Sequence, residues 1–535
     1  MKRSSLKIIF IILIIVLVIG AIYINAYNKK DITQAGEFIQ SNNEDTIISN
    51  NIRIGIIQFD NMNPILSNNK NVQDVSRLIF DPLFTLTEDY KLKEALATEC
   101  SKLDDTTYII KLRENVRWQD GTKFDVSDVI FTIDMLKKEE NESVYYYNVA
   151  DISSVEEIDE YTLKIIVNKK ISYFEYNLIF PIVSSKYFDE NNFTSESKNL
   201  KLPGTGTFYI SEVSNNNILL KKNLNCWNNQ MIKLDSININ LYDSLSSTIN
   251  AFKSGEIDLF TTSNRKIDEY LKNINHNEQE YINRNYDYII LNCSNKILEN
   301  KEVRQAINST IDKEDIIKDV YNNKYKQSNF PLDFGCYAYD SNNTIIASDR
   351  NVAKSLLLDN GWKYSSKRWR KTVNGRYLKI ELNILVNKSN ANLVKVANKI
   401  KEQLDSIGVI TTVVQADTKQ FNNKIKNQQY DIVLSSANYS YSPSLNKYFK
   451  EDNLANYKNE EIINLLNEIE NTTDENELKQ KYTRITEIYN DEVPYISLYY
   501  NTNTMIYSTS LKGTVKPNSY NLFYGIESWY REYKK

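Results

Sequence analysis

The segment NVRWQDGTKFDVSDVIFTIDMLKK, residues 115–138, decides how this chain folds and what it can bind, because it carries three closely spaced carboxylates. Asp120 precedes Gly121, and this pair predicts a turn. Asp125 lies where a helix N-cap is expected, and Asp128 follows at the positive end of the same helix. Apolar residues then recur at helical spacing: Val126, Val129, Ile130, Ile133 and Leu136. Each aspartate therefore has a structural role, and we expect no metal ion, because a calcium loop needs denser alternating oxygen ligands.

The composition limits the classes of function. The chain of 535 residues, 41% hydrophobic and 25% charged, is typical of a soluble protein, of about two to four domains. Its 65 basic and 69 acidic residues give a formal charge of −4, which argues against a nucleic-acid partner. The single histidine, His276, has polar neighbours that predict a solvated loop, not a catalytic or zinc-binding residue. The four cysteines form no C-x-x-C pair and predict no zinc site, redox motif or cofactor: Cys100, Cys226, Cys293 and Cys336.

The N-terminus predicts a membrane segment. Basic residues precede an uninterrupted apolar run at residues 8–24, which favours a cytoplasmic N-terminus. The run is long for a signal-peptide core and at the short limit for a membrane span. We therefore expect residues 1–30 to form a signal anchor, with a cleaved signal peptide as the alternative, and residues 31–45 to form a polar tether. The remainder would then lie on the outer face of the cytoplasmic membrane, or be secreted if the segment is cleaved.

Strands and helices are mixed along the rest of the chain. Alternating or apolar-rich segments predict strands at residues 52–59, 107–118, 161–168 and 217–223. Helical periodicity predicts helices at residues 125–138, 245–255, 300–311, 349–361, 392–408 and 478–492. Three of these helices end at a glycine in the manner of a C-cap: Gly255, Gly361 and Gly408. The fold class is therefore mixed α/β.

Motifs bear on two other functions. An enzyme is disfavoured, because the chain has neither a G-x-S-x-G elbow nor a Walker lysine, and GTGTF at 204–208 lacks the third glycine of a dinucleotide loop. Binding of a polyanion is suggested by the basic segment 361–376, in which Trp362 and Trp369 lie between basic residues. We favour an exposed hairpin with solvated basic side chains for this segment.

The sequence VRWQDGTKFDVSDVIFTIDML resembles the signature segment of the family 5 extracellular solute-binding proteins, the oligopeptide and dipeptide receptors of bacterial ABC importers. Other segments resemble the family in the expected order: FDPLFTLTEDYKLKEALATE, PGTGTFYISEV, LKKNLNCW, INAFKSGEIDLF, LNCSNKILENKEVRQAINSTIDKEDII, NVAKSLLLDNGW, KIKEQLDSIGV, YDIVLSSA and EVPYISLYY. The resemblance runs from about residue 51 to the C-terminus.

The resemblance implies a two-lobe, hinged periplasmic-binding-protein-like fold with an extra inserted domain. Domain I would comprise residues 46–82, 183–290 and 500–535, domain II residues 83–182, and domain III residues 291–499. A peptide or other small solute would bind between the lobes, and closure would bury it. A monomeric receptor of this kind delivers its solute to an ABC permease and performs no chemistry. A membrane-anchored sensor built on the same module is the alternative.

The resemblance also directs attention to the segment YDIVLSSANYSYSPSLNKYFK, residues 430–450. Peptide receptors of the family place an aspartate soon after this YD strand, where it pairs with the peptide α-ammonium. Here residues 432–450 contain no acid, and Asn438 or Tyr439 would take that position. An acid from another loop is one explanation; a solute without a free α-amine is the other. The ligand-binding residues expected on this basis are Ser435, Ser436, Asn438, Tyr439 and Tyr441, together with Phe59 and Asn61.

Overall fold

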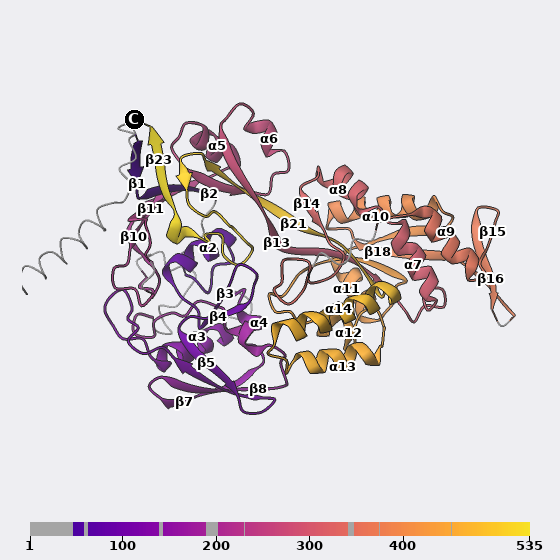
Figure 1. Ribbon diagram of the computed structural model, residues 1–535, viewed down its shortest axis with the longest axis horizontal. Coiled ribbons are helices and arrows are strands. Elements are labelled where there is room, and N and C mark those ends of the chain that lie inside the picture. The colour runs from indigo at the N-terminus through magenta and orange to yellow at the C-terminus, as the bar shows by residue number, and fades with distance from the viewer. Residues whose placement is uncertain are drawn as a thin grey trace, which may run out of the picture. The chain divides into compact units, whose positions relative to one another are not determined.

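The computed structural model (Figure 1) describes residues 46–57, 63–138, 143–188, 202–228, 231–340, 347–373, 375–450 and 452–534. The expected membrane segment at 1–30, the tether at 31–45, Phe59 and Asn61 lie outside these residues. None of the helices in the described ranges is both long and apolar enough to cross a membrane. The chain divides into two compact units, Met1–Ser49 with Glu532–Lys535, and Asn50–Arg531. In the first unit the structure describes β1 (Thr46–Ser49), and the following elements belong to the second.

The largest sheet in the described part of the chain has 11 strands, in the order β19-β18-β20-β13-β21-β12-β2-β11-β10-β9, with β14 also paired to β21. Parallel pairs join β2 to β11 and β12, and β18 to β19 and β20, so the sheet is mixed. The strands are β2 (Asn51–Ile57), β9 (Phe208–Val213), β10 (Asn217–Lys222), β11 (Ser236–Tyr242), β12 (Leu259–Thr262), β13 (His276–Leu291), β14 (Tyr325–Gln327), β18 (Glu381–Asn387), β19 (Ile410–Ala416), β20 (Ile432–Asn438) and β21 (Tyr495–Ser508). This arrangement confirms the mixed α/β class.

Two long strands, β13 and β21, run side by side through the middle of this sheet (Figure 1). The first part of β13 pairs with the last part of β21, which continues to β12. The last part of β13 pairs with the first part of β21 and, on its other edge, with β20. The register shifts between Ile282 and Tyr286, where the two pairings meet. The same two strands therefore belong to both ends of the sheet.

A smaller antiparallel sheet has the order β5-β6-β8-β7, with helix α3 (Val126–Lys138) packed on β7. Its strands are β5 (Ala97–Lys102), β6 (Thr107–Leu112), β7 (Ile152–Asp159) and β8 (Thr162–Val167). Alternate residues of β6 and β8 are buried, which is the pattern expected for strands with one face on a core. The strand predicted at 107–118 ends at Leu112, and the predicted turn at Asp120–Gly121 lies inside one isolated bridge between Arg117 and Lys123.

Helices pack on the large sheet and on one another. Helix α10 packs on β18 and β19, α7 contacts α9, and α13 contacts α14. The helices are α2 (Lys70–Ile79), α5 (Leu245–Lys253), α7 (Lys301–Thr310), α8 (Lys313–Tyr321), α9 (Arg350–Asp359), α10 (Ala391–Asp405), α11 (Thr418–Lys426), α13 (Glu460–Ile469) and α14 (Glu475–Glu492). The glycines predicted as C-caps, Gly255, Gly361 and Gly408, all have positive φ angles, as that role requires.

The aspartates of the opening segment are engaged by the chain itself. Asp120 accepts hydrogen bonds from the backbone and hydroxyl of Thr122 at 2.9 and 2.6 Å. Asp125 precedes α3 and accepts from the backbone N–H of Ser127 at 3.0 Å. Asp128 is fully buried and accepts from the backbone N–H of Asp125 at 3.2 Å. The carboxylate oxygens thus cap the turn and the helix.

We expect Asp125→Ala to lower the free energy of unfolding by about 0.5–2 kcal/mol, the usual loss for a helix N-cap. Calcium or EDTA should leave the melting temperature of the unaltered protein unchanged. Thermal and urea unfolding of both proteins measure these effects. A rise in melting temperature with calcium that Asp125→Ala abolishes would contradict the assignment and restore a metal site.

The prediction for His276 was wrong, and the favoured prediction for the segment 361–376, an exposed hairpin, holds for its strands but not for its tryptophans. His276 does not lie in a solvated loop: it begins strand β13, is half-buried, and its Nδ1 lies 2.8 Å from the carbonyl oxygen of Ile274. The basic segment 361–376 does form antiparallel strands, β15 (Lys363–Ser365), β16 (Arg368–Val373) and β17 (Arg376–Lys379). Its two tryptophans, however, are 1% and 2% exposed, at Trp362 and Trp369. They cannot stack on a polyanion, because their rings pack in a core of the protein.

Candidate functional site

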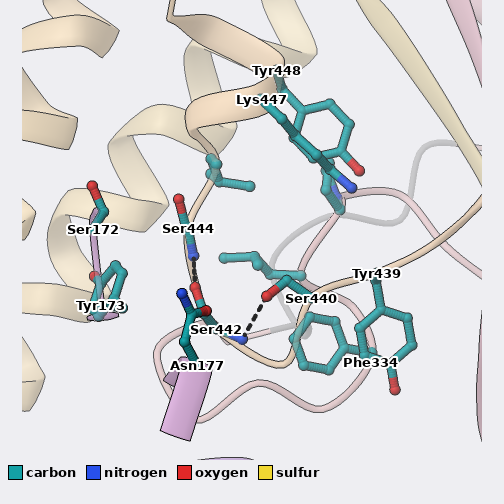
Figure 2. Close-up of a pocket in the computed structure, with 13 residues that line it drawn as sticks. Ser172, Tyr173, Asn177, Phe334, Tyr439, Ser440, Ser442, Ser444, Lys447 and Tyr448 are labelled. Carbon is teal, nitrogen blue, oxygen red and sulfur yellow. Dashed lines mark hydrogen bonds between the residues drawn. The ribbon is translucent and has the colours of Figure 1, made fainter. Parts of the chain in front are cut away.

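A cavity of about 210 Å³ lies where three segments that are distant in sequence meet (Figure 2). The segments surround the short helix η1 (Phe174–Leu178), follow strand β14, and follow strand β20. The lining residues are Ser172, Tyr173, Asn177, Pro331, Leu332, Phe334, Tyr439, Ser440, Ser442, Ser444, Leu445, Lys447 and Tyr448. In Figure 2, Lys447 and Tyr448 lie above Phe334 and Tyr439, and Ser172 and Tyr173 lie to their left. A cavity with aromatic and hydroxyl walls and one ammonium group suits a small solute that carries polar groups.

The aromatic wall continues beyond the cavity. The rings of Phe334 and Tyr439 stack with centroids 4.3 Å apart, and Tyr90 meets Phe334 edge-on at 5.3 Å. Tyr441 stacks on Tyr90 at 5.6 Å, and Tyr500 meets Tyr439 edge-on at 5.4 Å. Such pairs stabilise a packed arrangement by about 0.5–1.5 kcal/mol each beyond their buried area. The rings therefore hold segments from the beginning, middle and end of the chain together.

Ser519 joins the same segments by hydrogen bonds. Its hydroxyl lies 3.1 Å from the hydroxyl of Tyr90 and 2.7 Å from that of Tyr439. Its backbone carbonyl accepts a hydrogen bond from the hydroxyl of Tyr441 at 2.8 Å. Burial raises the pKa values of the Tyr439 and Tyr441 hydroxyls, so these phenols stay neutral and remain able to donate.

An ion network around Glu470 borders the cavity through Ser172. Its carboxylate pairs with Lys170 at 2.8 Å and with Lys450 at 2.9 Å, and it accepts a hydrogen bond from the Ser172 hydroxyl. Burial opposes ionisation, but these hydrogen bonds lower the pKa of Glu470 to about 2. The amide of Asn446 donates to Ser172 at 2.8 Å. The segment before η1 is therefore fixed to the segment after β20 by charge as well as by packing.

The residues predicted from strand β20 do not converge on the cavity. Side chains alternate along a strand, and antiparallel partners share a face. Ser435 pairs with Tyr288 and lies on the face of the aromatic wall, whereas Ser436 pairs with Asp287 on the opposite face. Asn438 lies on that opposite face as well. Of the expected residues, Tyr439 lines the cavity and Tyr441 packs next to it.

The sequence reasoning missed a charged face of helix α2. Lys70, Asp74 and Arg77 recur at intervals of four and three residues, so they lie along one side of this helix. Their signal was this spacing opposite an apolar set of buried residues, Val72, Val75, Leu78 and Ile79. Arg284 of β13 was missed too: it donates to the carbonyl oxygen of Tyr439 from Nη2 at 3.0 Å and from Nε at 3.3 Å.

Within the described ranges, no three His, Cys, Asp or Glu side chains are grouped so that they could hold a metal ion. Asp74 is engaged by the ammonium of Lys70, and Asp128 by donors of its own helix start and by Ser185. The arrangement is therefore one for binding by aromatic surfaces, hydroxyls and cations.

Comparison with known proteins identifies the family. Residues 91–453 match the model of the bacterial extracellular solute-binding proteins, family 5. The oligopeptide-binding protein AppA of Bacillus subtilis (strain 168) is 23% identical over 495 residues, which cover 88% of this chain and 89% of the relative.

Solved structures share the fold. The structure of Bacillus subtilis AppA in complex with a nonapeptide is 21% identical and has a TM-score of 0.58, covering 90% of this chain and 98% of that one. The periplasmic murein tripeptide-binding protein MppA, in its unliganded open form, is 18% identical and has a TM-score of 0.76, covering 92% of this chain and 99% of that one. The family model spans more than half of the sequence, and the chain belongs to family 5 of the bacterial extracellular solute-binding proteins.

Proposed function

We propose that this protein is the substrate-binding receptor of an ABC importer, which captures a peptide or peptide-like solute and delivers it unchanged to a membrane permease. The observation that carries the proposal is the cavity of about 210 Å³ at the meeting point of three distant segments, in a chain of this family. Relatives named as oligopeptide- and murein tripeptide-binding proteins support a peptide-like solute.

The two-lobe arrangement with domain I, domain II and domain III belongs to this proposal. Its support is the course of β13 and β21, which both serve the two ends of the large sheet. The change of register between Ile282 and Tyr286 marks the crossing, a few residues before the boundary at 290 that the family resemblance implied. Rotation about such a crossing would open the contacts at Ser519 and expose the cavity.

The partner and the location complete the proposal. A monomeric receptor would meet a permease at the outer face of the cytoplasmic membrane, held there by residues 1–30 or secreted if they are cleaved. The apolar run at 8–24 supports the anchor. An extracellular location agrees with the family as a whole.

We expect the protein to bind a small solute and to close around it without converting it. Mass spectrometry of small molecules that co-purify with the protein would identify the solute. After its removal and return, small-angle scattering should show a smaller radius of gyration with solute, and the solute should be recovered intact. Recovery of a cleaved product would contradict the proposal.

Two tyrosine variants test whether the solute binds in the cavity. Tyr439→Ala removes a ring of the cavity wall and should weaken solute binding at least tenfold, because the ring stacks on Phe334 at 4.3 Å. Tyr147→Ala changes a side chain that is 83% exposed and should leave binding unchanged. Equal affinities of the two variants would show that the solute binds elsewhere.

A further inference from the structure

Four cationic side chains, which we call the cationic row, gather from α2, β13 and the short helix α12 (Asn446–Phe449): Lys70, Arg77, Arg284 and Lys447. Arg284 lies within electrostatic range of both lysines. Burial chiefly, and the charge of Arg284 in addition, lower the pKa of Lys70, and the same two causes lower the pKa of Lys447 to about 8. Like charges are thus held near one another in a region of reduced hydration.

The two lysines of the row remain accessible. The side chain of Lys70 is 53% exposed. The side chain of Lys447 is exposed and borders the cavity. The Lys447 ammonium can therefore reach a solute in the cavity.

The two arginines of the row enclose a pair of tyrosines. The guanidinium carbon of Arg77 lies 3.7 Å from the ring centre of Tyr520. The Tyr520 and Tyr441 rings are 5.4 Å apart and nearly perpendicular. The guanidinium carbon of Arg284 lies 4.7 Å from the ring centre of Tyr441. Stacking fixes each guanidinium plane, so that little entropy is lost when an anion binds it.

The cationic row has too few counter-charges in the described part of the chain. Asp74 is 4% exposed and is paired with Lys70. Among the described residues no carboxylate forms an ion pair with Arg77, Arg284 or Lys447, and the buried Nε–H of Arg77 has no hydrogen-bond acceptor. Residues 432–450 add no acid, because that segment contains neither Asp nor Glu. A cationic group that is partly desolvated and has no counter-charge is costly, so a bound solute is expected to supply the negative charge.

We propose that the solute is anionic, that its carboxylates pair with Arg77 and Arg284, and that it has no free amino group at that point. This inference rests on the proposed function as a solute receptor. A planar carboxylate matches the fork of N–H donors that a guanidinium presents. Arg284 can offer the fork of its two terminal nitrogens, because its Nε–H and one Nη2–H already donate to the carbonyl oxygen of Tyr439. An amino group would be repelled by the cationic row, and residues 432–450 contain no acid that could pair with it.

The test uses the full-length chain and one random tetrapeptide library in three matched forms. The first form is unmodified, the second is succinylated so that each amine becomes a carboxylate, and the third is methyl-esterified so that each carboxylate becomes neutral. Affinity selection with mass spectrometry ranks the three forms, and calorimetry measures the affinity of single selected peptides. We expect the succinylated form to bind at least tenfold more tightly than the unmodified form, and the esterified form to be left unbound.

Variants show whether the cationic row causes the preference. Arg77→Gln and Arg284→Gln should each weaken binding of a succinylated peptide about 10- to 100-fold. Lys447→Gln, at an exposed position where folding is not at risk, should weaken it less. Arg265→Gln is the matched control and should change nothing. This guanidinium lies 4.4 and 4.8 Å from the ring centres of Tyr321 and Tyr325, outside the cationic row.

The outcomes separate this inference from the function on which it rests. Binding of all three forms with equal affinity, or a preference for the esterified form, would overturn the anionic solute and leave the receptor function standing. A preference for the succinylated form that survives all three substitutions in the cationic row would overturn the assignment to these residues. Binding of none of the forms would overturn the peptide-receptor function, and the inference with it.

Discussion

Asp128→Ala is expected to lower the free energy of unfolding by about 3–5 kcal/mol, because several buried donors would each lose their acceptor, at about 1–3 kcal/mol apiece. These donors are the indole N–H of Trp118 at 3.0 Å, the backbone and hydroxyl of Ser185 at 2.8 and 2.7 Å, and the backbone N–H of Asp125 at 3.2 Å. Burial raises the pKa of Asp128 in spite of these four hydrogen bonds. The side chain is therefore a structural acceptor that joins three segments.

Urea unfolding followed by circular dichroism measures this loss. Asp134→Ala is the matched control, because Asp134 belongs to the same helix and is exposed. Asp134→Ala should change the free energy of unfolding by less than about 0.5 kcal/mol. A loss of less than 1 kcal/mol in Asp128→Ala, about the value of a single exposed hydrogen bond, would show that the buried donors find other acceptors.

Gly204→Ala is expected to have the second large effect, a loss of about 3 kcal/mol or more, of the order found when buried positions are overpacked. A Cβ atom at Gly204 would lie 1.8 Å from the carbonyl oxygen of Ile79, which is backbone and cannot rotate away. Gly206 approaches the same place and donates its N–H to that carbonyl oxygen at 2.8 Å. The glycines of the GTGTF turn thus allow close packing against the end of α2.

The position of α2 links this substitution to binding. Because α2 carries Lys70 and Arg77, a shift of its C-terminal end should weaken binding of succinylated peptides as well as stability. Gly335→Ala is the control: Gly335 has a φ of 97° and open space around it, so the substitution costs only backbone strain, about 1–3 kcal/mol. Unfolding and calorimetry compare the two variants. Unchanged binding in a destabilised Gly204→Ala protein would show that α2 keeps its place.

Six helices, α3, α5, α7, α9, α10 and α14, could be predicted because their signals are local, whereas α2, α8, α11 and α13 were not predicted. A capping serine at Ser244 and a glycine at Gly255 bound α5, and both lie within a few residues of it. Strand β13 could not be predicted, since its first part is exposed and polar and its conformation depends on pairing with β21, far along the chain. Pairing with a distant strand determines whether such a segment forms a strand, and its own pattern of apolar and polar residues does not.

Only part of the candidate site could be predicted from the sequence. The absence of acids from residues 432–450 was visible in the sequence, and Tyr439, one of the predicted ligand residues, lines the cavity. The face to which each side chain of β20 points depends on its register with β13, so Ser436 and Asn438 could not be separated from Ser435 beforehand. The cationic row joins α2, β13 and α12 through the fold, and no sequence window contains it.

The long strand β21 also has a consequence for the order in which the protein is made. It occupies Tyr495–Ser508, near the end of the chain, and it pairs with β12, β13 and β14. Neither end of the large sheet can be completed until these residues have left the ribosome, because β21 contributes hydrogen bonds to both. Contacts between residues so far apart in sequence form late and slowly. Until β21 has been made, a nascent chain can pair β2 with β11 and β10 with β9, but it cannot join these strands to β13 and β20 in one sheet.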